Sequence, residues 1–483
     1  MAVEWSGLSP ELLLTTDREA AEPLRSQLER QLRDAIRSGR LGAGERLPST
    51  RALSKELGLS RGLVQDCYAQ LQAEGYLSAD VGSATRVAAG ADRTANGTPG
   101  AQARSDVGYA DRSSSDRPTS DRPSADFASG VPDLASFPRA DWSWAVREAC
   151  RAAPNSAFNY GDPRGSLEFR EVLAAYLRRV RAAAASPDSI VVCTGFAQGL
   201  NLILRALVTT GVSLVAFEDP GYNVTVSNAA ARAGIKVVPV PVNESGVDVS
   251  ALDASGARAV VLTPAHQWPT GVVLSPQRRL QLIKWAADRE GTIIEDDYDA
   301  EFRYDRDPVG ALQGLAPERV AAIGTVSKSL APSLRLGWIV CPPGLADVVI
   351  EEKALHDRGS PVLDQLALAL LVRSGRFDRH LRRMRASYAH RRAALVDALA
   401  AHAPEVSLTG LAAGFHAVAH LPGALEEETV IGAARERSVG LYGMSEHRSD
   451  RSVLPAQLVL GFGNLTERAI ASGIAAVGDL LRR

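Results

Sequence analysis

The hydrophobic pattern changes twice along the chain and divides it into three parts. Residues 10–89 show short stretches with apolar residues at helical spacing, followed by a β-branched hairpin signal. Residues 90–125 are mainly Ser, Asp, Arg, Gly, Thr and Pro, with almost no large apolar side chain. Such a segment cannot bury enough surface to offset its ordering entropy. The pattern predicts an N-terminal domain, a flexible linker and a C-terminal domain over residues 126–483.

The C-terminal part has the pattern of an α/β fold. Short, continuous apolar runs rich in β-branched residues alternate with helical stretches such as 197–209 and 276–289. Continuous runs indicate strands covered on both faces, so we expect a mostly parallel central sheet. After about residue 360 the chain opens with helices and then alternates, which predicts a smaller α+β subdomain. The expected strands are 189–194, 213–218, 236–242, 259–263, 291–295 and 320–325.

The N-terminal part predicts a helix-turn-helix followed by a wing hairpin. Two helical stretches meet at Gly58, Ser60 is a good N-cap for the second, and Gly75 ends it. The segment 81–87 is short, contains glycine and is β-branched, as in a wing. The second helix has one apolar face, made by Leu63, Val64, Cys67, Tyr68 and Leu71.

This geometry places polar side chains where such domains meet DNA. Ser60, Arg61 and Gln65 lie at the start of the second helix, where base edges and phosphates are contacted, and Arg51 opens the first helix. Arg86 of the wing is a candidate phosphate contact. The predicted partner is therefore a double-stranded DNA operator. The alternative is a small helical protein-interaction domain with solvated arginines.

Composition limits the remaining possibilities. A length of 483 residues predicts about two to four domains, and 45% hydrophobic residues is ordinary for a soluble protein. The net charge of −2 gives no general attraction to nucleic acid, so DNA contacts require a local basic face. Four single cysteines argue against a metal site or disulfide framework, and we predict no metal. Without a leader pattern or a long apolar run, we expect a cytoplasmic protein with no membrane partner.

The segment 324–335 has the composition of a pyridoxal 5′-phosphate (PLP) pocket. Lys328 lies among Thr325, Ser327 and Arg335, shortly after the acidic segment that contains Asp296. PLP needs a lysine for its aldehyde, an anion for its pyridinium nitrogen and donors for its phosphate. Lys328 and Asp296 supply the first two, and Thr325, Ser327 and Arg335 the third. The alternative is a surface lysine.

Two family resemblances extend these predictions. Residues 46–77 resemble the winged helix of GntR regulators, and the rest of the chain resembles a fold-type I aminotransferase. The fusion is similar to the MocR subfamily, and residues 130–138 look closest to its regulators of vitamin B6 synthesis. The resemblance implies a PLP-binding regulator rather than an enzyme. It also implies a homodimer, because 160–165 resembles a segment that enters the partner's site.

The resemblance assigns roles to further residues. Ala197 and Gln198 correspond to phosphate-facing positions in a turn that opens a helix, as suits an anion. Tyr222 corresponds to the residue that stacks on the cofactor ring. Asp296 would pair with the ring nitrogen and Tyr298 with the ring oxygen.

Several positions depart from the family pattern or have weaker assignments. Trp268 replaces an asparagine that contacts the cofactor in aminotransferases. His266 either compensates as a cofactor contact or is structural. Asp297 and Asp299 are expected to cap helices or to be solvated.

The effector is predicted from missing arginines. Related regulators bind an effector carboxylate with two arginines, whose positions here are Val224 and Glu446. A carboxylate facing Glu446 would be repelled. His447 and Arg448 could still bind a carboxylate, but their spacing is shifted from the family pattern. We therefore expect PLP itself to be the effector. The alternatives are a regulator that senses an amino acid or amine as an external aldimine, and an active aminotransferase.

Overall fold

The computed structural model describes residues 14, 16–17, 20, 22–37, 41–42, 44–78, 85–88, 123–299, 301–304, 310–423, 425–451 and 455–482. The predicted linker, 90–125, lies almost wholly outside these residues. The turn of the predicted wing, 81–84, also lies outside them.

The N-terminal domain is a helix-turn-helix with a short hairpin, as predicted. It contains three helices, and its two strands pair antiparallel with Leu77 opposite Val87. Ser49 and Ser60 cap the second and third helices through their side chains. The domain has its own apolar core, which includes the fully buried Leu28, Val64 and Leu71. The elements are α1 (Leu24–Arg37), α2 (Thr50–Glu56), α3 (Arg61–Ala73), β1 (Leu77–Ser78) and β2 (Arg86–Val87).

The large domain is built on an eight-stranded mixed sheet with the order β4-β11-β10-β9-β8-β5-β6-β7. The pairs from β10 through β6 are parallel, which confirms the predicted parallel centre. β11 and β7 pair antiparallel with their neighbours and were not predicted. The strands are β4 (Ile190–Cys193), β5 (Leu214–Asp219), β6 (Lys236–Asn243), β7 (Gly246–Val247), β8 (Ala259–Leu262), β9 (Thr292–Asp297), β10 (Val320–Thr325) and β11 (Gly337–Val340).

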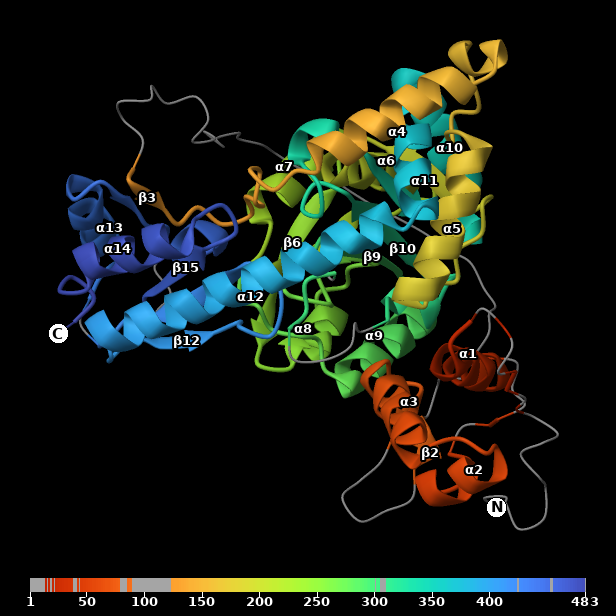
Figure 1. Ribbon diagram of the computed structural model, residues 1–483, viewed down its shortest axis with the longest axis horizontal. Helices are drawn as coiled ribbons and strands as arrows, with labels where there is room; N and C mark the ends of the chain where they lie inside the picture. Colours follow the sequence, from red (N-terminus) through yellow and green to blue (C-terminus); the bar gives the residue numbers. More distant parts are fainter. Residues whose placement is uncertain are drawn as a thin grey trace.

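Helices cover both faces of this sheet (Figure 1). Consecutive residues of β9 pack on opposite faces: Ile294 belongs to the core formed with α6, α7 and α10, and Ile293 to the core formed with α8, α9 and η5. The helical elements of the two faces are α6 (Phe196–Thr209), α7 (Asn223–Ala233), α8 (Val249–Ala254), α9 (Pro276–Asp288), η5 (Leu312–Gly314) and α10 (Pro343–Asp357).

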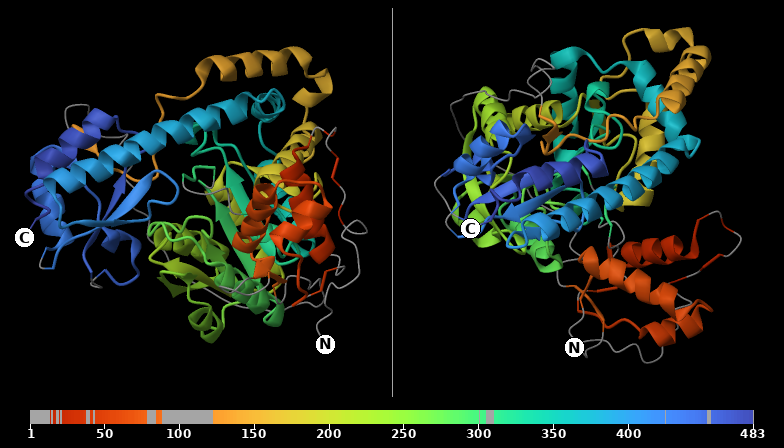
Figure 2. Two further views of the ribbon diagram at one scale, coloured as in Figure 1. Left: turned by 60° about the horizontal axis from the view of Figure 1, so that its bottom comes forward. Right: turned by 60° about the vertical axis from the view of Figure 1, so that its left-hand side comes forward.

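The C-terminal subdomain is α+β, as predicted. The long helix α12 runs from the large domain into it (Figures 1 and 2). Its antiparallel sheet has the order β12-β13-β15, and β14 pairs with β3 from the start of the large domain. Its elements are α12 (Arg376–His402), β12 (Ser407–Thr409), β13 (His416–His420), α13 (Glu427–Glu436), β14 (Val439–Gly440), η7 (Met444–His447), β15 (Gln457–Gly461) and α14 (Glu467–Val477).

The remaining elements complete the large domain: β3 (Ala125–Asp126), α4 (Arg139–Ala152), η4 (Asn155–Phe158), α5 (Leu167–Arg181), η6 (Pro332–Leu334) and α11 (Val362–Arg373). Among the described residues, no helix is both long enough and apolar enough to cross a membrane.

Candidate cofactor pocket and DNA-binding surface

The C-terminal ends of β9 and β10 bring Asp296 and Lys328 together. The strands are parallel neighbours with Ile323 opposite Asp296, and Lys328 follows β10 by three residues. The Lys328 Nζ donates a hydrogen bond to the Gly130 carbonyl at 2.7 Å. Burial lowers the pKa of Lys328, against the opposing effect of the Asp296 charge. A lowered lysine pKa increases the fraction of neutral, nucleophilic amine.

Asp296 is buried in a way that suits a cationic ring nitrogen. Its side chain is 2% exposed, and its Oδ1 has no hydrogen-bond partner among the described residues. Burial, and next the charge of Asp297, raise the pKa of Asp296 well above its usual value. A buried oxygen without a donor is costly, so a protonated pyridine nitrogen would satisfy it. The residues present therefore fit PLP.

Hydroxyls and an arginine gather beside the start of α6. The Thr325 and Ser327 hydroxyls are 2.8 Å apart, and the Ser327 backbone N–H donates to Thr325 Oγ1 at 3.1 Å. Arg335 donates to the Thr194 carbonyl, which brings its guanidinium to this turn. Gly195 has φ +98°, and a Cβ there would lie 3.2 Å from Arg335 Nη2. The turn thus depends on glycine to admit the arginine.

The first residues of α6 can contribute backbone donors to the same place. Ala197 and Gln198 are in its first turn, where N–H groups have no intrahelical partner. The Gln198 side chain is already engaged: its Oε1 accepts from Thr194 N at 2.8 Å, and its Nε2 donates to Asp357 Oδ2 at 2.6 Å. Its backbone N–H is therefore the better phosphate contact.

The rings of Tyr222, Trp268 and Phe196 lie together beside this site, and we call them the aromatic wall. The Tyr222 ring, which immediately precedes α7, stacks on Trp268 with centroids 5.9 Å apart, and it also contacts Phe196 at 5.4 Å. Trp268 meets the Tyr298 ring edge-on at 6.3 Å. The rings therefore hold one another in place, as a surface for a flat ligand requires.

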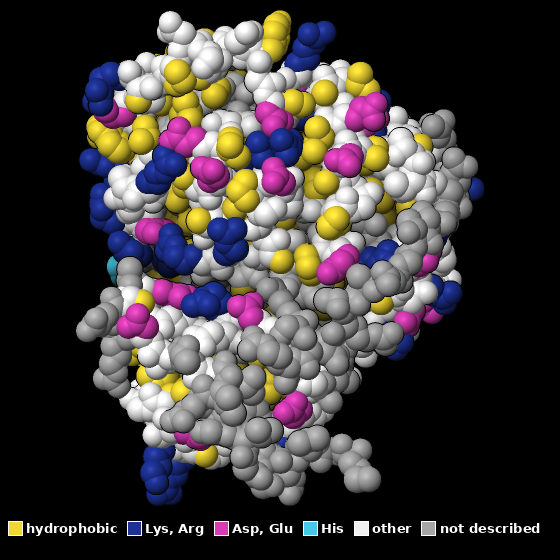
Figure 3. Space-filling model, turned by 90° about the vertical axis from the view of Figure 1, so that its right-hand side faces the viewer, with side chains coloured by type: hydrophobic (Ala, Val, Ile, Leu, Met, Phe, Trp, Pro, Cys, Tyr) yellow, Lys and Arg dark blue, Asp and Glu magenta, His cyan; other side chains and the backbone are white. Residues whose placement is uncertain are grey.

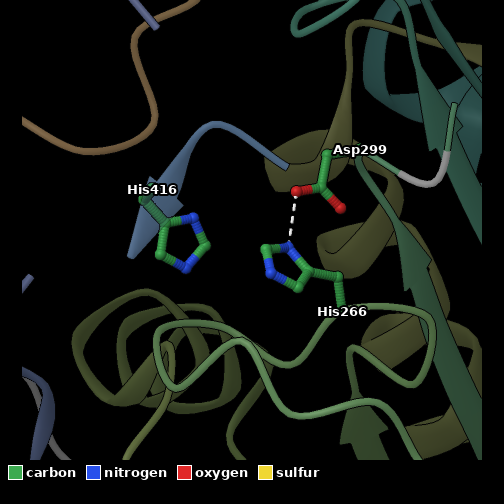
Figure 4. Close-up of side chains that lie close together, drawn as sticks. All are labelled: His266, Asp299 and His416. Carbon is green, nitrogen blue, oxygen red and sulfur yellow. Dashed lines mark hydrogen bonds and ion pairs between the residues drawn. The ribbon is translucent and has the colours of Figure 1, made fainter. Parts of the chain in front are cut away.

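Tyr298, His266 and Asp299 form a hydrogen-bonded group at the base of the wall. The Tyr298 hydroxyl donates to the His266 carbonyl at 3.0 Å, and His266 Nδ1 lies 2.7 Å from Asp299 Oδ2 (Figure 4). Asp299 is 1% exposed, so the prediction that it is capping or solvated was wrong. The same prediction for Asp297 was also wrong, because Asp297 forms a two-bonded ion pair with Arg181. Contacts between distant segments override the local preference of these carboxylates.

His416 completes a cluster with metal-like spacing. Ligand atoms of His266, Asp299 and His416 all lie within 4.8 Å of one another. The Nε2 atom of each histidine lies near a backbone carbonyl: His266 Nε2 is 3.4 Å from that of Gly410, and His416 Nε2 is 3.1 Å from that of Pro269. Burial, and next His266, hold the pKa of His416 well below its usual value. The cluster joins the large domain, through His266 and Asp299, to the C-terminal subdomain, through His416.

The C-terminal subdomain places a neutral ring against Trp268. The His447 ring lies 5.5 Å from Trp268, and burial lowers its pKa to about 4. Val224 is 42% exposed, and Glu446 is also exposed. Arg448 bonds to the Gln457 side chain. The residue that packs against the aromatic wall is thus His447 rather than Glu446.

Sequence reasoning missed two residues of this region, His416 and Glu218. His416 is a single histidine outside any motif, so no local signal identified it, whereas His447 is a sequence-predicted candidate for binding a carboxylate. Glu218 is buried and accepts from Thr263 N at 2.9 Å and from Thr263 Oγ1 at 2.8 Å. Thr263 Oγ1 in turn accepts from Trp268 N at 2.9 Å. Glu218 therefore holds the loop that carries the aromatic wall, and burial raises its pKa to about 7.

The predicted DNA contacts all lie on the exposed surface of the N-terminal domain. The Ser60 hydroxyl accepts from Leu63 N at 3.2 Å as an N-cap, and Arg86 donates to the Gly44 carbonyl at 3.0 Å. Their contacts with DNA are predictions. The exposed candidates are Arg51, Ser60, Arg61, Gln65 and Arg86.

Comparisons with known proteins agree with both domains. Residues 24–87 match the family described as bacterial regulatory proteins, gntR family, and residues 124–444 match aminotransferase class I and II. The chain is 34% identical over 470 residues to the probable rhizopine catabolism regulatory protein MocR of Rhizobium meliloti, covering 96% of this chain and 94% of the relative. It is 32% identical over 454 residues to the pyridoxine biosynthesis transcriptional regulator PdxR of Corynebacterium glutamicum, covering 94% and 95%.

Solved structures extend the comparison to the large domain. The structure of Pyrococcus horikoshii kynurenine aminotransferase has a TM-score of 0.67 and 25% identity, covering 75% of this chain and 91% of that chain. An archaeal alanine:glyoxylate aminotransferase has the same TM-score and 27% identity, covering 74% and 90%.

A gntR-type helix-turn-helix domain joined to an aminotransferase-like domain defines a class of transcriptional regulators. The chain belongs to this class, as a MocR-type member of the GntR family. Its nearly full-length similarity to named regulators supports a regulatory rather than an enzymatic role.

Proposed function

We propose that this regulator binds PLP at Lys328 and that PLP occupancy changes its binding to a DNA operator, controlling genes of vitamin B6 synthesis. The observation that carries the proposal is Asp296 Oδ1, buried and without a hydrogen-bond partner among the described residues, on the strand beside Lys328. When bound, PLP supplies an electron-poor ring and an aldehyde carbon. Tyr222, Tyr298 and Arg335 would position its ring face, ring oxygen and phosphate.

The neutral side chains at and beside the aromatic wall support PLP itself as the effector. An effector carboxylate needs a cation or several donors to offset its desolvation. His416 and His447 have lowered pKa values because they are buried, so both are neutral at pH 7. Trp268 and Tyr222 add only ring surface beside them. Similarity to a relative named for pyridoxine biosynthesis supports the same conclusion.

We further propose a homodimer with domains at 10–89 and 126–483 joined by a linker. Four large apolar side chains are more than half exposed among the described residues: Phe158 at 59%, Tyr160 at 81%, Leu167 at 55% and Leu355 at 75%. Figure 3 shows hydrophobic side chains exposed between charged ones on one face of the molecule. A second copy of the chain would cover such side chains.

The test combines visible absorption with operator binding. The purified protein should gain a PLP absorption band, and its operator affinity should differ with and without PLP. A band without any change in affinity would contradict PLP as the effector. The absence of a band would contradict the pocket assignment.

A second candidate effector is an amino acid or amine that reacts with bound PLP. It is favoured by the diversity of the relatives, whose names include a rhizopine catabolism regulator and the regulator TauR of Rhodobacter capsulatus, 31% identical over 477 residues. Titrating the PLP-loaded protein with amines separates the two candidates, because only the second predicts a shift of the absorption band.

A further inference from the structure

The N-terminal domain is seated on the large domain through the end of α3 and the residues that follow it. The Tyr76 hydroxyl donates to the Gly314 carbonyl at 2.8 Å, and Tyr76 is 2% exposed. Leu315 packs against the apolar core of the N-terminal domain and also against a core of the large domain. Figure 1 shows α3 ending beside α9. We call residues 310–315 the docking segment.

Buried charged groups line this contact. Glu74 is 1% exposed and accepts two hydrogen bonds from Arg33, at 2.7 and 2.6 Å. A Cβ on Gly310 would lie 3.0 Å from Glu74 Cδ, so the docking segment approaches this carboxylate closely. On the other side, Arg279 is 1% exposed and donates to the Gly310 carbonyl. The docking segment therefore lies between a buried carboxylate, which is paired with Arg33, and a buried guanidinium, which bonds to the segment directly.

The docking segment is held by β9, the strand that carries Asp296. The Glu295 carboxylate accepts from the backbone N–H groups of Leu312 and Gln313, both at 2.9 Å. Side chains alternate along a strand, so Glu295 faces the docking segment while Asp296 faces the pocket on the opposite side. β9 therefore contacts the docking segment through Glu295 and the cofactor pocket through the adjacent Asp296.

A second link runs from β9 to the start of the docking segment. Asp297 pairs with Arg181 at 2.6 and 2.8 Å, and the Arg181 carbonyl accepts from Ala311 N at 2.8 Å. The Arg181 side chain is 3% exposed. The two links fix the docking segment to β9 at two points, through Glu295 and Asp297, which share one face of the strand.

We propose that the docking segment is the surface on which the DNA-binding domain docks, which we call the seat. We further propose that Glu295 couples the seat to the cofactor pocket. Pairing of Asp296 with a bound ring would steady the end of β9 and, through Glu295, the seat. The candidate DNA contacts at the start of α3 are at the opposite end of that helix from Tyr76, so a seated domain keeps them free. The coupling to the pocket rests on the proposed function, whereas the seat does not.

Hydrogen exchange of the full-length protein tests the seat without PLP. Tyr76→Phe removes only the hydroxyl that donates to Gly314. The matched control is Tyr68→Phe, because the Tyr68 hydroxyl bonds to the Pro48 carbonyl at 3.0 Å within the N-terminal domain. We expect exchange at residues 311–315 to rise about fivefold in Tyr76→Phe, the effect of losing one hydrogen bond, and to stay unchanged in the control. Equal behaviour of the two variants would overturn the seat.

Operator titrations with and without PLP test the coupling. We expect the PLP-dependent change in affinity to shrink toward none in Tyr76→Phe and in Glu295→Gln, while the visible PLP band is retained. A wild-type response to PLP that persists unchanged in Tyr76→Phe would overturn the coupling, even if Glu295→Gln failed to fold. If wild-type operator binding ignored PLP, the proposed function and the coupling would both fail, and hydrogen exchange would still decide the seat.

Discussion

The rings of Tyr222 and Trp268 stack with their centroids 5.9 Å apart and their planes 15° apart. They come from the loops after β5 and β8, which are parallel neighbours in the sheet. His447 from the C-terminal subdomain meets the same tryptophan edge-on. The large domain and the C-terminal subdomain thus both contribute side chains to this region, and these side chains are uncharged at neutral pH.

The neutral side chains at the aromatic wall predict that amino acids do not act as effectors. Amino acids at millimolar concentration should leave the absorption band of the PLP-loaded wild type unchanged, because their carboxylate finds no cation at His447. His447→Arg places a guanidinium beside Trp268 and should make the band respond to amino acids. His447→Gln is the neutral control and should behave as the wild type does. A wild-type response to an amino acid would contradict this prediction.

Lys328→Ala should abolish the visible PLP band, because the variant lacks the amine that bonds to the aldehyde. Circular dichroism should show an unchanged fold, since the Lys328 side chain donates to a single backbone carbonyl, that of Gly130, among the described residues. Lys284→Ala is a suitable control, because Lys284 is exposed and pairs only with Asp288 one helical turn away. A wild-type band in Lys328→Ala would contradict the assignment.

Arg61→Ala should weaken operator binding by about 1–3 kcal/mol if Arg61 reads a base edge. Arg30→Ala provides a control within the same domain, because Arg30 lies on α1 rather than on α3 and pairs with Glu22. Fluorescence anisotropy with a labelled operator measures both variants. Equal affinities for the two variants would show that Arg61 is not a DNA contact.

Glu218 should make stability depend on pH. Its folded pKa of about 7 lies above the ordinary value of 4.5, because the carboxyl is buried. The folded state therefore keeps the proton longer than the unfolded state, and the stabilisation is fully present below pH 4.5 and is lost as the pH rises through about 7. Glu218→Gln keeps an acceptor for Thr263 without this titration. Relative to the wild type, its free energy of unfolding should rise by about 2 kcal/mol between pH 5.5 and 8.

Urea unfolding of the PLP-free proteins at the two pH values measures this difference. Asp253→Asn is the control, because Asp253 pairs with Arg289 on the surface. Its stability relative to the wild type should not change over this range. Parallel pH profiles for Glu218→Gln and the wild type would show that Glu218 does not titrate there.

The sequence by itself determined that a helix-turn-helix domain precedes an α/β domain, and it determined most strands of the sheet. It also predicted Lys328 and Asp296 as the cofactor-binding pair. These features are local: Ser60 and Gly75 mark the ends of α3, continuous apolar runs mark the parallel strands, and Lys328 lies among its hydroxyls within one short segment. Local signals of this kind depend on nearest neighbours, which a sequence displays directly.

The tertiary structure alone decided what the remaining polar groups do. Asp299 reaches His266, Asp297 reaches Arg181, and Tyr76 reaches Gly314, with partners separated by 33, 116 and 238 positions in the chain. A carboxylate or hydroxyl takes whichever partner the fold brings to it when both become buried, because leaving it unpaired is costly. That choice depends on the packing of distant segments, so no local pattern in the sequence records it.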